Sequence, residues 1–153
     1  MNSNDAARAI GRALAMQSGL ANIAGGPTHI YAHDIEVLPT GQEQAVDPSA
    51  GIELPAVFIR VKCQALVGSS TIGRAKIEID VVSQADDSTA QEHAQREWAI
   101  RELMANQGAL VLACQVIGHV RLLGKPCLVE NDPEIEHRAF KTPFTYQAGI
   151  QGF

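Results

Sequence analysis

Two histidines and an aspartate in the first third of the chain are the first residues whose types could form a site. His29, His33 and Asp34 lie close together in sequence, and imidazole and carboxylate groups both bind zinc. A helix would bring the two histidines together, but the run Gly25-Gly26-Pro27 just upstream does not favour one. No third ligand follows at a recognisable spacing. We therefore expect no bound metal or cofactor, and the alternation over 28–37 predicts a short strand.

Other residues that could do chemistry do not form a recognisable catalytic motif. The segment 68–73 is rich in Gly and Ser but lacks the lysine of a phosphate-binding loop, so it is predicted to be a hairpin turn. Glu134 and Glu136 fall on a predicted loop, where solvated carboxylates are expected rather than an acid–base pair. Cys63 and Cys114 lie in apolar surroundings, which is typical of structural thiols in a reducing compartment. We expect the protein not to be an enzyme.

The elements that would position any site centre on residues 56–83. Apolar and polar side chains alternate through two runs there, and a period of two predicts half-buried strands. The polar break between the runs predicts an antiparallel hairpin. A register with Arg60 opposite Asp80 and Lys62 opposite Glu78 would add two charge pairs, each worth about 0.2–1 kcal/mol. The apolar positions are Val57, Ile59, Val61, Cys63 and Ala65, then Ala75, Ile77, Ile79 and Val81.

Two helices are expected to pack with this hairpin. The first is predicted over 4–23, after possible N-cap residues at 3–5. Its apolar side is small and rich in alanine, and this side is expected to pack either on the sheet or on a neighbouring subunit. The second helix is predicted over 88–106, with a capping box at its start.

The second helix is the expected cover for the hairpin, with Trp98 at the centre of the buried seam. Its predicted buried face holds Ala90, Ala94, Trp98, Leu103, Met104 and Ala105, and its predicted solvent face holds Glu92, Gln95, Arg96 and Glu97.

The remaining segments are predicted as follows. Residues 38–54 form a long surface loop, either a mobile excursion or a binding loop. Residues 110–117 form a central strand, and 118–129 a second strand pair or an irregular arm. Residues 137–150 form a last strand, in which Pro143 indicates an edge position or a bulge.

Composition sets the broad class. The 153 residues are expected to form a single domain spanning 1–153. The predicted fold is α+β: an antiparallel or mixed β-sheet of four or more strands with a long β-hairpin, packed against two α-helices. The net charge is −5, and the sequence shows no run of Lys and Arg, which argues against a nucleic-acid-binding protein. No apolar run approaches the length of a membrane span, so no membrane partner is expected.

The order helix, acidic loop, long hairpin, helix and terminal strands resembles that of the tail terminator proteins of tailed bacteriophages. The resemblance is carried by residues 54–59, by 76–83, by the helix around 92–104 and by the closing run 144–150. The region 109–129 is the part that matches least. These are patterns of strands and helices, and the family offers no catalytic residues to carry over.

The resemblance implies a structural virion protein. Such a subunit forms a homohexameric ring at the head-proximal end of the tail, ends tail-tube polymerisation, and meets the tail tube protein and the neck proteins. It would be assembled in the host cytoplasm, and DNA would pass through the lumen without specific binding. Alternatives are another neck, head-completion or minor tail protein, or a small α+β enzyme or ligand-binding domain.

A ring requires two different surfaces of one subunit to meet. As a hypothesis, we assign the subunit interface to Arg8 and Arg12 beside the first helix and to Glu78 and Asp80 on the polar face of the hairpin.

Overall fold

The computed structural model describes residues 3–17, 28–46, 53–65, 72–84, 90–106, 116–124, 129–130 and 139–151, together with Leu20, Ile23 and Pro126. The described elements, in chain order, are α1 (Ser3–Ala15), β1 (His29–Ala32), β2 (Ile35–Val37), β3 (Glu43–Ala45), β4 (Ala56–Ala65), β5 (Ile72–Gln84), α3 (Ala90–Ala105), β6 (Val116–Leu122), β7 (Val129–Glu130) and β8 (Ala139–Gln151).

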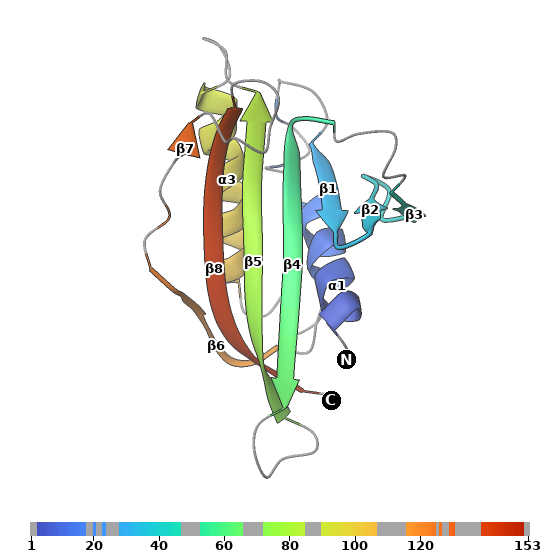
Figure 1. Cartoon of the computed structure of the whole chain (residues 1–153), viewed down its shortest axis with the longest axis vertical. Coiled ribbons are helices and arrows are strands. Elements are labelled where there is room, and N and C mark those ends of the chain that lie inside the picture. Colours follow the sequence, from blue (N-terminus) through green and yellow to red (C-terminus); the bar gives the residue numbers. More distant parts are fainter. Residues whose placement is uncertain are drawn as a thin grey trace.

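The described strands form one mixed sheet in the order β3-β2-β1-β4-β5-β8-β6, with β7 pairing to β8. The β1–β4 pair is parallel and the others are antiparallel. The strands β4, β5 and β8 run along the length of the molecule (Figure 1). The prediction of an α+β fold, with a sheet of four or more strands packed against two helices, is confirmed.

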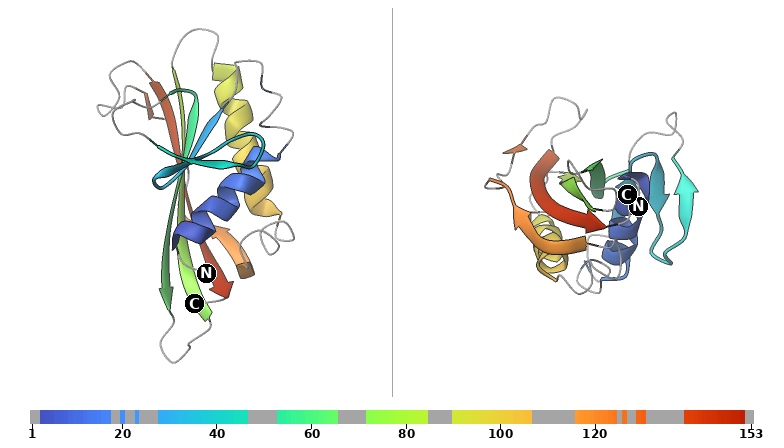
Figure 2. Two further views of the ribbon diagram at one scale, coloured as in Figure 1. Left: turned by 90° about the vertical axis from the view of Figure 1, so that its right-hand side faces the viewer. Right: turned by 90° about the horizontal axis from the view of Figure 1, so that it is seen from below.

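Both helices lie on the same face of the sheet, so the molecule has two layers (Figure 2). The helix α1 packs on β4, β1 and β2, and α3 packs on β5 and β8. Alternate residues of the strands point into the core between the layers, because successive side chains of a strand face opposite ways. The opposite face of β4, β5 and β8 carries polar side chains; we call it the open face.

The first helix uses its small-residue side within its own subunit. Ala6, Ala7 and Ile10 are fully buried in the core, and a Cβ added to Gly11 would lie 3.0 Å from Val37 Cγ2. The glycine therefore lets α1 approach the sheet closely. Of the two alternatives, packing on the sheet is confirmed and packing of this side on a neighbouring subunit is wrong.

The predicted extent of that helix, 4–23, is also wrong. It ends at Ala15, where the Gln17 N–H bonds the Leu14 carbonyl at 3.0 Å and tightens the last turn. Met16, the first residue beyond the helix, is 78% exposed.

The segment predicted as one strand over 28–37 is two strands. A tight turn at His33 and Asp34 separates β1 from β2, and His33 has a positive φ of 55°. Part of the predicted loop 38–54 is also a strand, because β3 pairs with β2. Figure 2 shows this three-stranded part curling around α1. Residues 47–52 lie outside the described residues.

The antiparallel hairpin is present, but its register differs from the prediction by two residues. Arg60 lies opposite Glu78, Lys62 opposite Lys76, and Phe58 opposite Asp80. A shift of two leaves every side chain on its predicted face, so the apolar pattern alone cannot choose between the two registers. In the observed register one guanidinium reaches both carboxylates. The first residues of the predicted turn 68–73 lie outside the described part, and Ile72 and Gly73 already belong to β5.

The helix α3 is where it was predicted, and Leu103 and Met104 are buried as predicted, but the rest of its predicted buried face is wrong. Trp98 is 63% exposed, whereas Arg96, predicted to face solvent, is 2% exposed. The sheet beneath this part of the helix offers hydroxyl groups that satisfy polar side chains, so burial of arginine and histidine is compensated there. The buried residues of α3 are His93, Arg96, Ala99, Ile100, Leu103 and Met104.

The C-terminal strands also differ from expectation. Within the described residues β6 pairs only with β8, so the prediction of a central strand at 110–117 is wrong for Val116 and Ile117; residues 110–115 lie outside the described part. The β6 strand also covers residues 118–122 of the segment 118–129. Pro143 lies inside β8, between the residues that pair with β7 and those that pair with β6. The Thr145 carbonyl accepts a hydrogen bond from the Leu123 N–H, so the backbone groups of Thr145 point away from β5. Backbone groups two residues apart in a strand point to the same side. The missing N–H of Pro143 therefore removes no hydrogen bond between β8 and β5.

Candidate functional site

A buried polar cluster joins α3 to the sheet, and the sequence did not reveal it. His93 Nδ1 lies 2.8 Å from Ser83 Oγ, and His93 Nε2 lies 2.8 Å from Thr142 Oγ1. Thr142 donates to Glu97 Oε1 at 2.9 Å. On the other side, Arg96 Nη1 donates to Ser83 Oγ at 3.2 Å. The three sheet and helix partners Ser83, His93 and Thr142 are each no more than 2% exposed.

One arrangement of protons allows all these hydrogen bonds to form at once, as a directed chain in which each group donates to the next. Arg96 donates to Ser83, Ser83 donates to His93 Nδ1, His93 Nε2–H donates to Thr142, and Thr142 donates to Glu97. The chain runs from a guanidinium to a carboxylate, so each bond polarises the next in the same direction. It requires His93 to be neutral. Desolvation lowers the pKa of His93 from its usual value, with attraction from Glu97 opposing and repulsion from Arg96 adding to the effect.

The cluster superficially resembles a catalytic Ser–His–acid arrangement, but its geometry serves packing. A nucleophile must reach its substrate, and Ser83 is 1% exposed beneath α3. The Ser83 oxygen already accepts from Arg96. Arg96 also donates through Nε to Thr28 Oγ1 at 3.0 Å. These bonds hold α3, β5, β8 and the segment before β1 together.

The neutral state of His93 predicts loss of stability in mild acid. Because its pKa is lowered in the folded protein, the unfolded chain takes up the proton first as pH falls. The stabilisation should be fully present above about pH 6.5, the usual value for histidine, and should decrease below it with a limiting slope of about 1.4 kcal/mol per pH unit. Urea unfolding between pH 7.5 and 5 would measure this. His93→Gln should remove the dependence, and an identical profile in that variant would refute it.

The open face gathers basic residues that lie far apart in the sequence. On β4, β5, β8 and β6 it presents six Lys and Arg side chains but only two carboxylates among the described residues. The chain as a whole has 12 Lys and Arg against 17 Asp and Glu. We call this surface the basic face. Its cations are Arg60, Lys62, Arg74, Lys76, Arg121 and Lys141, and its carboxylates are Glu78 and Asp80. The sequence shows no run of Lys and Arg, and it is the sheet that brings these six side chains onto one face.

Both carboxylates of the basic face are neutralised within it. Arg60 Nη2 lies 3.0 Å from Asp80 and 3.2 Å from Glu78, and Lys76 Nζ lies 3.0 Å from Glu78. The hydrogen bond from Lys76 lowers the pKa of Glu78 from its usual value, and attraction from Arg60 and Lys62 adds to this, while burial opposes it. The described residues provide no ion pair for Lys62, Arg74 or Arg121.

The structure does not bring together the four residues of our interface hypothesis. Arg8 and Arg12 lie on α1, where both make ion pairs with Glu43 of β3. Glu78 and Asp80 lie on the open face of β5. The helix α1 packs on the other side of the sheet (Figure 2). All four therefore have charged partners within their own subunit.

The candidate metal ligands of the N-terminal third also separate. His29 Nδ1 lies 2.7 Å from Glu36 and its Nε2 lies 3.1 Å from Glu53. His33 Nε2 instead accepts the Val61 N–H at 3.2 Å. Among the described residues, no three His, Cys, Asp or Glu side chains are placed to hold one metal ion.

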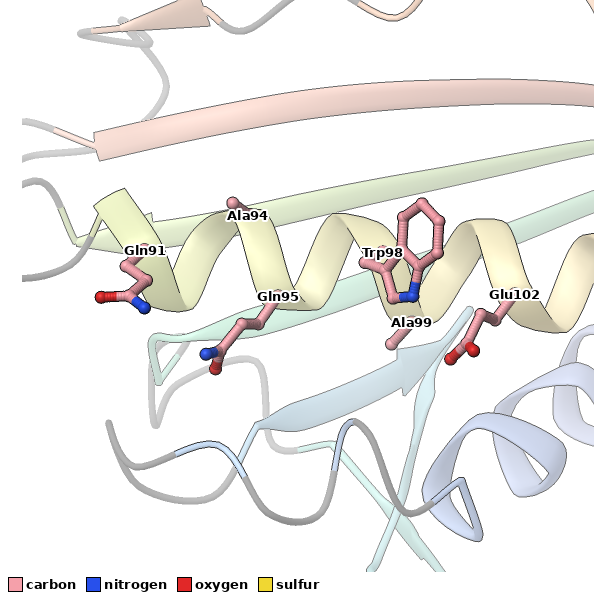
Figure 3. Close-up of a pocket in the computed structure, with 6 residues that line it drawn as sticks. All are labelled: Gln91, Ala94, Gln95, Trp98, Ala99 and Glu102. Atoms are coloured by element: carbon pink, nitrogen blue, oxygen red, sulfur yellow. The ribbon is translucent and has the colours of Figure 1, made fainter.

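The outer side of α3 carries an exposed tryptophan beside an open pocket of about 390 Å³ (Figure 3). Trp98 projects from the helix between Gln95 and Glu102 (Figure 3), and α3 lies on the side of the sheet away from the open face (Figure 2). An exposed tryptophan is unusual because burial of its large ring is favourable, and such residues are common anchors of protein interfaces. We call this surface the Trp98 patch. It is lined by Gln91, Ala94, Gln95, Trp98, Ala99 and Glu102.

Replacement of Trp98 should therefore leave the fold intact. With 63% of the side chain exposed, Trp98→Ala should change the free energy of unfolding by no more than about 1 kcal/mol. Ile100→Ala, two residues along the same helix and fully buried, should cost about 2–5 kcal/mol. Thermal and urea unfolding of the two variants would measure this, and equal losses would mean that Trp98 is buried after all.

Neither known protein-family models nor curated proteins give a match to this chain. In the part of the chain that the structure describes, no helix is long and apolar enough to cross a membrane.

Proposed function

We propose that the chain is a structural virion protein, a tail terminator that forms a ring at the head-proximal end of a phage tail. In this role it ends tail-tube polymerisation and joins the tail to the neck. Its partners are further copies of itself, the tail tube protein and a neck protein, while DNA passes through the lumen. The role requires neither catalysis nor a cofactor.

The observation that carries the proposal is the presence of two unlike surfaces on opposite sides of one small subunit. The basic face is cationic, and the Trp98 patch is partly apolar with a carboxylate at its side. A ring is built from one repeated contact between two different surfaces, so a ring subunit must present such a pair. The α+β fold, with two helices packed on one sheet, is of the class that the resemblance to tail terminators implies.

The buried polar cluster around His93 supports a structural role for the protein over an enzymatic one. His93 and Ser83 are buried between α3 and the sheet, and the hydrogen bonds of His93 to Ser83 and Thr142 tie α3 to β5 and β8. A small enzyme would need its acid–base group to be reachable by substrate.

Passage of DNA bears on how the subunit would sit in a ring. Lysine and arginine side chains bind phosphates, and a lumen lined with them would retain the DNA. The basic face therefore suits a contact between subunits better than the wall of the channel.

The direct test is electron microscopy of the purified protein, alone and with the tail tube protein. We expect sixfold rings, and tubes of limited length capped at one end. A protein that remains monomeric while tubes grow without limit in its presence would contradict the proposal.

A further inference from the structure

The basic face carries a charge arrangement that its own subunit does not balance. Lys62 lies directly opposite Lys76 across the hairpin, and like charges in this position destabilise a strand pair. The row continues through Gln147 of β8 to Arg121 of β6. Since neighbouring strands lie about 4.8 Å apart, the row spans about 14 Å. Lys76 forms an ion pair with Glu78. Lys62 and Arg121 form no ion pair among the described residues.

The complementary charge lies on the rest of the chain. Among the described residues, the basic face holds six of the ten Lys and Arg residues but only two of the eleven Asp and Glu residues. On α3, the three carboxylates Glu92, Glu97 and Glu102 outnumber the two arginines, Arg96 and Arg101. One subunit is thus polarised, with a surplus of cations on the open face and a surplus of carboxylates elsewhere, including the helix on the other side.

We infer that the basic face of one copy binds the Trp98 patch of a second copy, and that this is the contact which repeats around the ring. The occupant of the patch is a cationic side chain of the neighbour. A tryptophan face attracts lysine and arginine, and Glu102 adds an ion pair to the same group. Lys62 and Arg74 are the exposed cations of the hairpin suited to this role.

This contact reverses the signs of our interface hypothesis from the sequence. The hairpin contributes the cations, because its carboxylates are already paired, and a helix contributes the acid. The helix is α3, because the apolar side of α1 is used by its own sheet. The inference rests on the proposed function only in taking the partner to be a second copy within a ring.

A contact between two different surfaces can be tested by complementation. Lys62→Glu with Arg74→Glu reverses two cations of the basic face, and Trp98→Ala with Glu102→Gln removes the aromatic ring and the carboxylate of the patch. Each double variant alone should fold but stay monomeric, with the apparent dissociation constant raised about 30-fold or more, as for loss of an interface hot spot. Mixed together, they should form 1:1 dimers and nothing larger, because one intact contact remains. Sedimentation velocity would report the masses.

Two further variants sharpen the result. A chain that carries both Lys62→Glu and Glu102→Lys should assemble better than a chain with either substitution alone, because the charges are exchanged between the two surfaces. Arg8→Glu with Arg12→Glu is the matched control, which makes the same charge change on α1 and should leave rings intact.

The possible failures are distinguishable. If the wild-type protein forms rings that neither double variant disturbs, or if only the α1 variant dissolves them, the inference is wrong while the proposed function stands. If the wild-type protein forms no ring, even with tail tubes, both the inference and the proposed function are wrong. If the double variant of the basic face loses affinity for a short DNA duplex but assembles normally, the face binds polyanions and the inference is also overturned.

Discussion

Removal of residues 1–20 is expected to leave a chain that does not fold, rather than a folded subunit that has lost a surface helix. The deletion takes away α1, whose Ile10 and Leu14 are fully buried against the sheet. Burial of each such side chain contributes about 1.5–3 kcal/mol, and the deletion also uncovers the sheet residues beneath them. The total is comparable with the about 5–15 kcal/mol that stabilises a whole domain.

Circular dichroism and thermal unfolding of the truncated chain would measure this effect. No cooperative transition is expected. Leu14→Ala in the full chain should cost about 2–5 kcal/mol for the same reason. As a control, Arg12→Ala removes only a surface ion pair with Glu43 and should cost at most about 1 kcal/mol. A truncated protein with a normal melting transition would show that α1 is dispensable for the core.

Replacement of Arg96 by alanine should destabilise the protein by about 3–5 kcal/mol, as expected when one member of a buried charged network is removed. The guanidinium bonds Thr28 and Ser83, and without it the buried Ser83 oxygen loses its donor. The directed chain through His93 then loses its cationic end. Burial lowers the pKa of Arg96 from its usual value, and attraction from Glu92 on the same helix offsets part of that effect.

The adjacent exposed residue provides a matched control for this variant. Gln95→Ala makes a similar truncation one position earlier in α3 and should change stability by no more than about 0.5 kcal/mol. Arg96→Lys should fall between the two, because an ammonium keeps the charge but cannot reproduce the planar pair of bonds to Thr28 and Ser83. Equal urea midpoints for Arg96→Ala and Gln95→Ala would exclude the buried network.

Local pattern was sufficient for the existence and type of the main elements. The alternation through Val57, Ile59 and Val61 predicted a strand with one apolar face, and those three side chains are buried. The capping signal at Ser88 placed the second helix to within two residues of its described start at Ala90. Such patterns depend on neighbours along the chain, so they can be read without knowing the fold.

The features that matter most for the candidate surfaces depend on contacts between distant segments. The hairpin register could shift by two residues without moving any side chain to the other face, so charge pairing in the sequence did not select it. The buried side of α3 was set by Ser83 and Thr142, which lie on two different strands and offer hydrogen bonds to His93. Hydrophobicity alone therefore placed Trp98 inside and Arg96 outside, the reverse of the structure.

The basic face shows the same limit most clearly. Its cations come from four strands that are separated in sequence. Lys62 and Arg121 lie in one row only because β4, β5, β8 and β6 pair side by side. The sequence was sufficient for an α+β subunit with a half-polar hairpin, since periodicity and capping are local. Sheet order and register, which are properties of the packed chain, created the charged surface on one side and left the tryptophan exposed on the other.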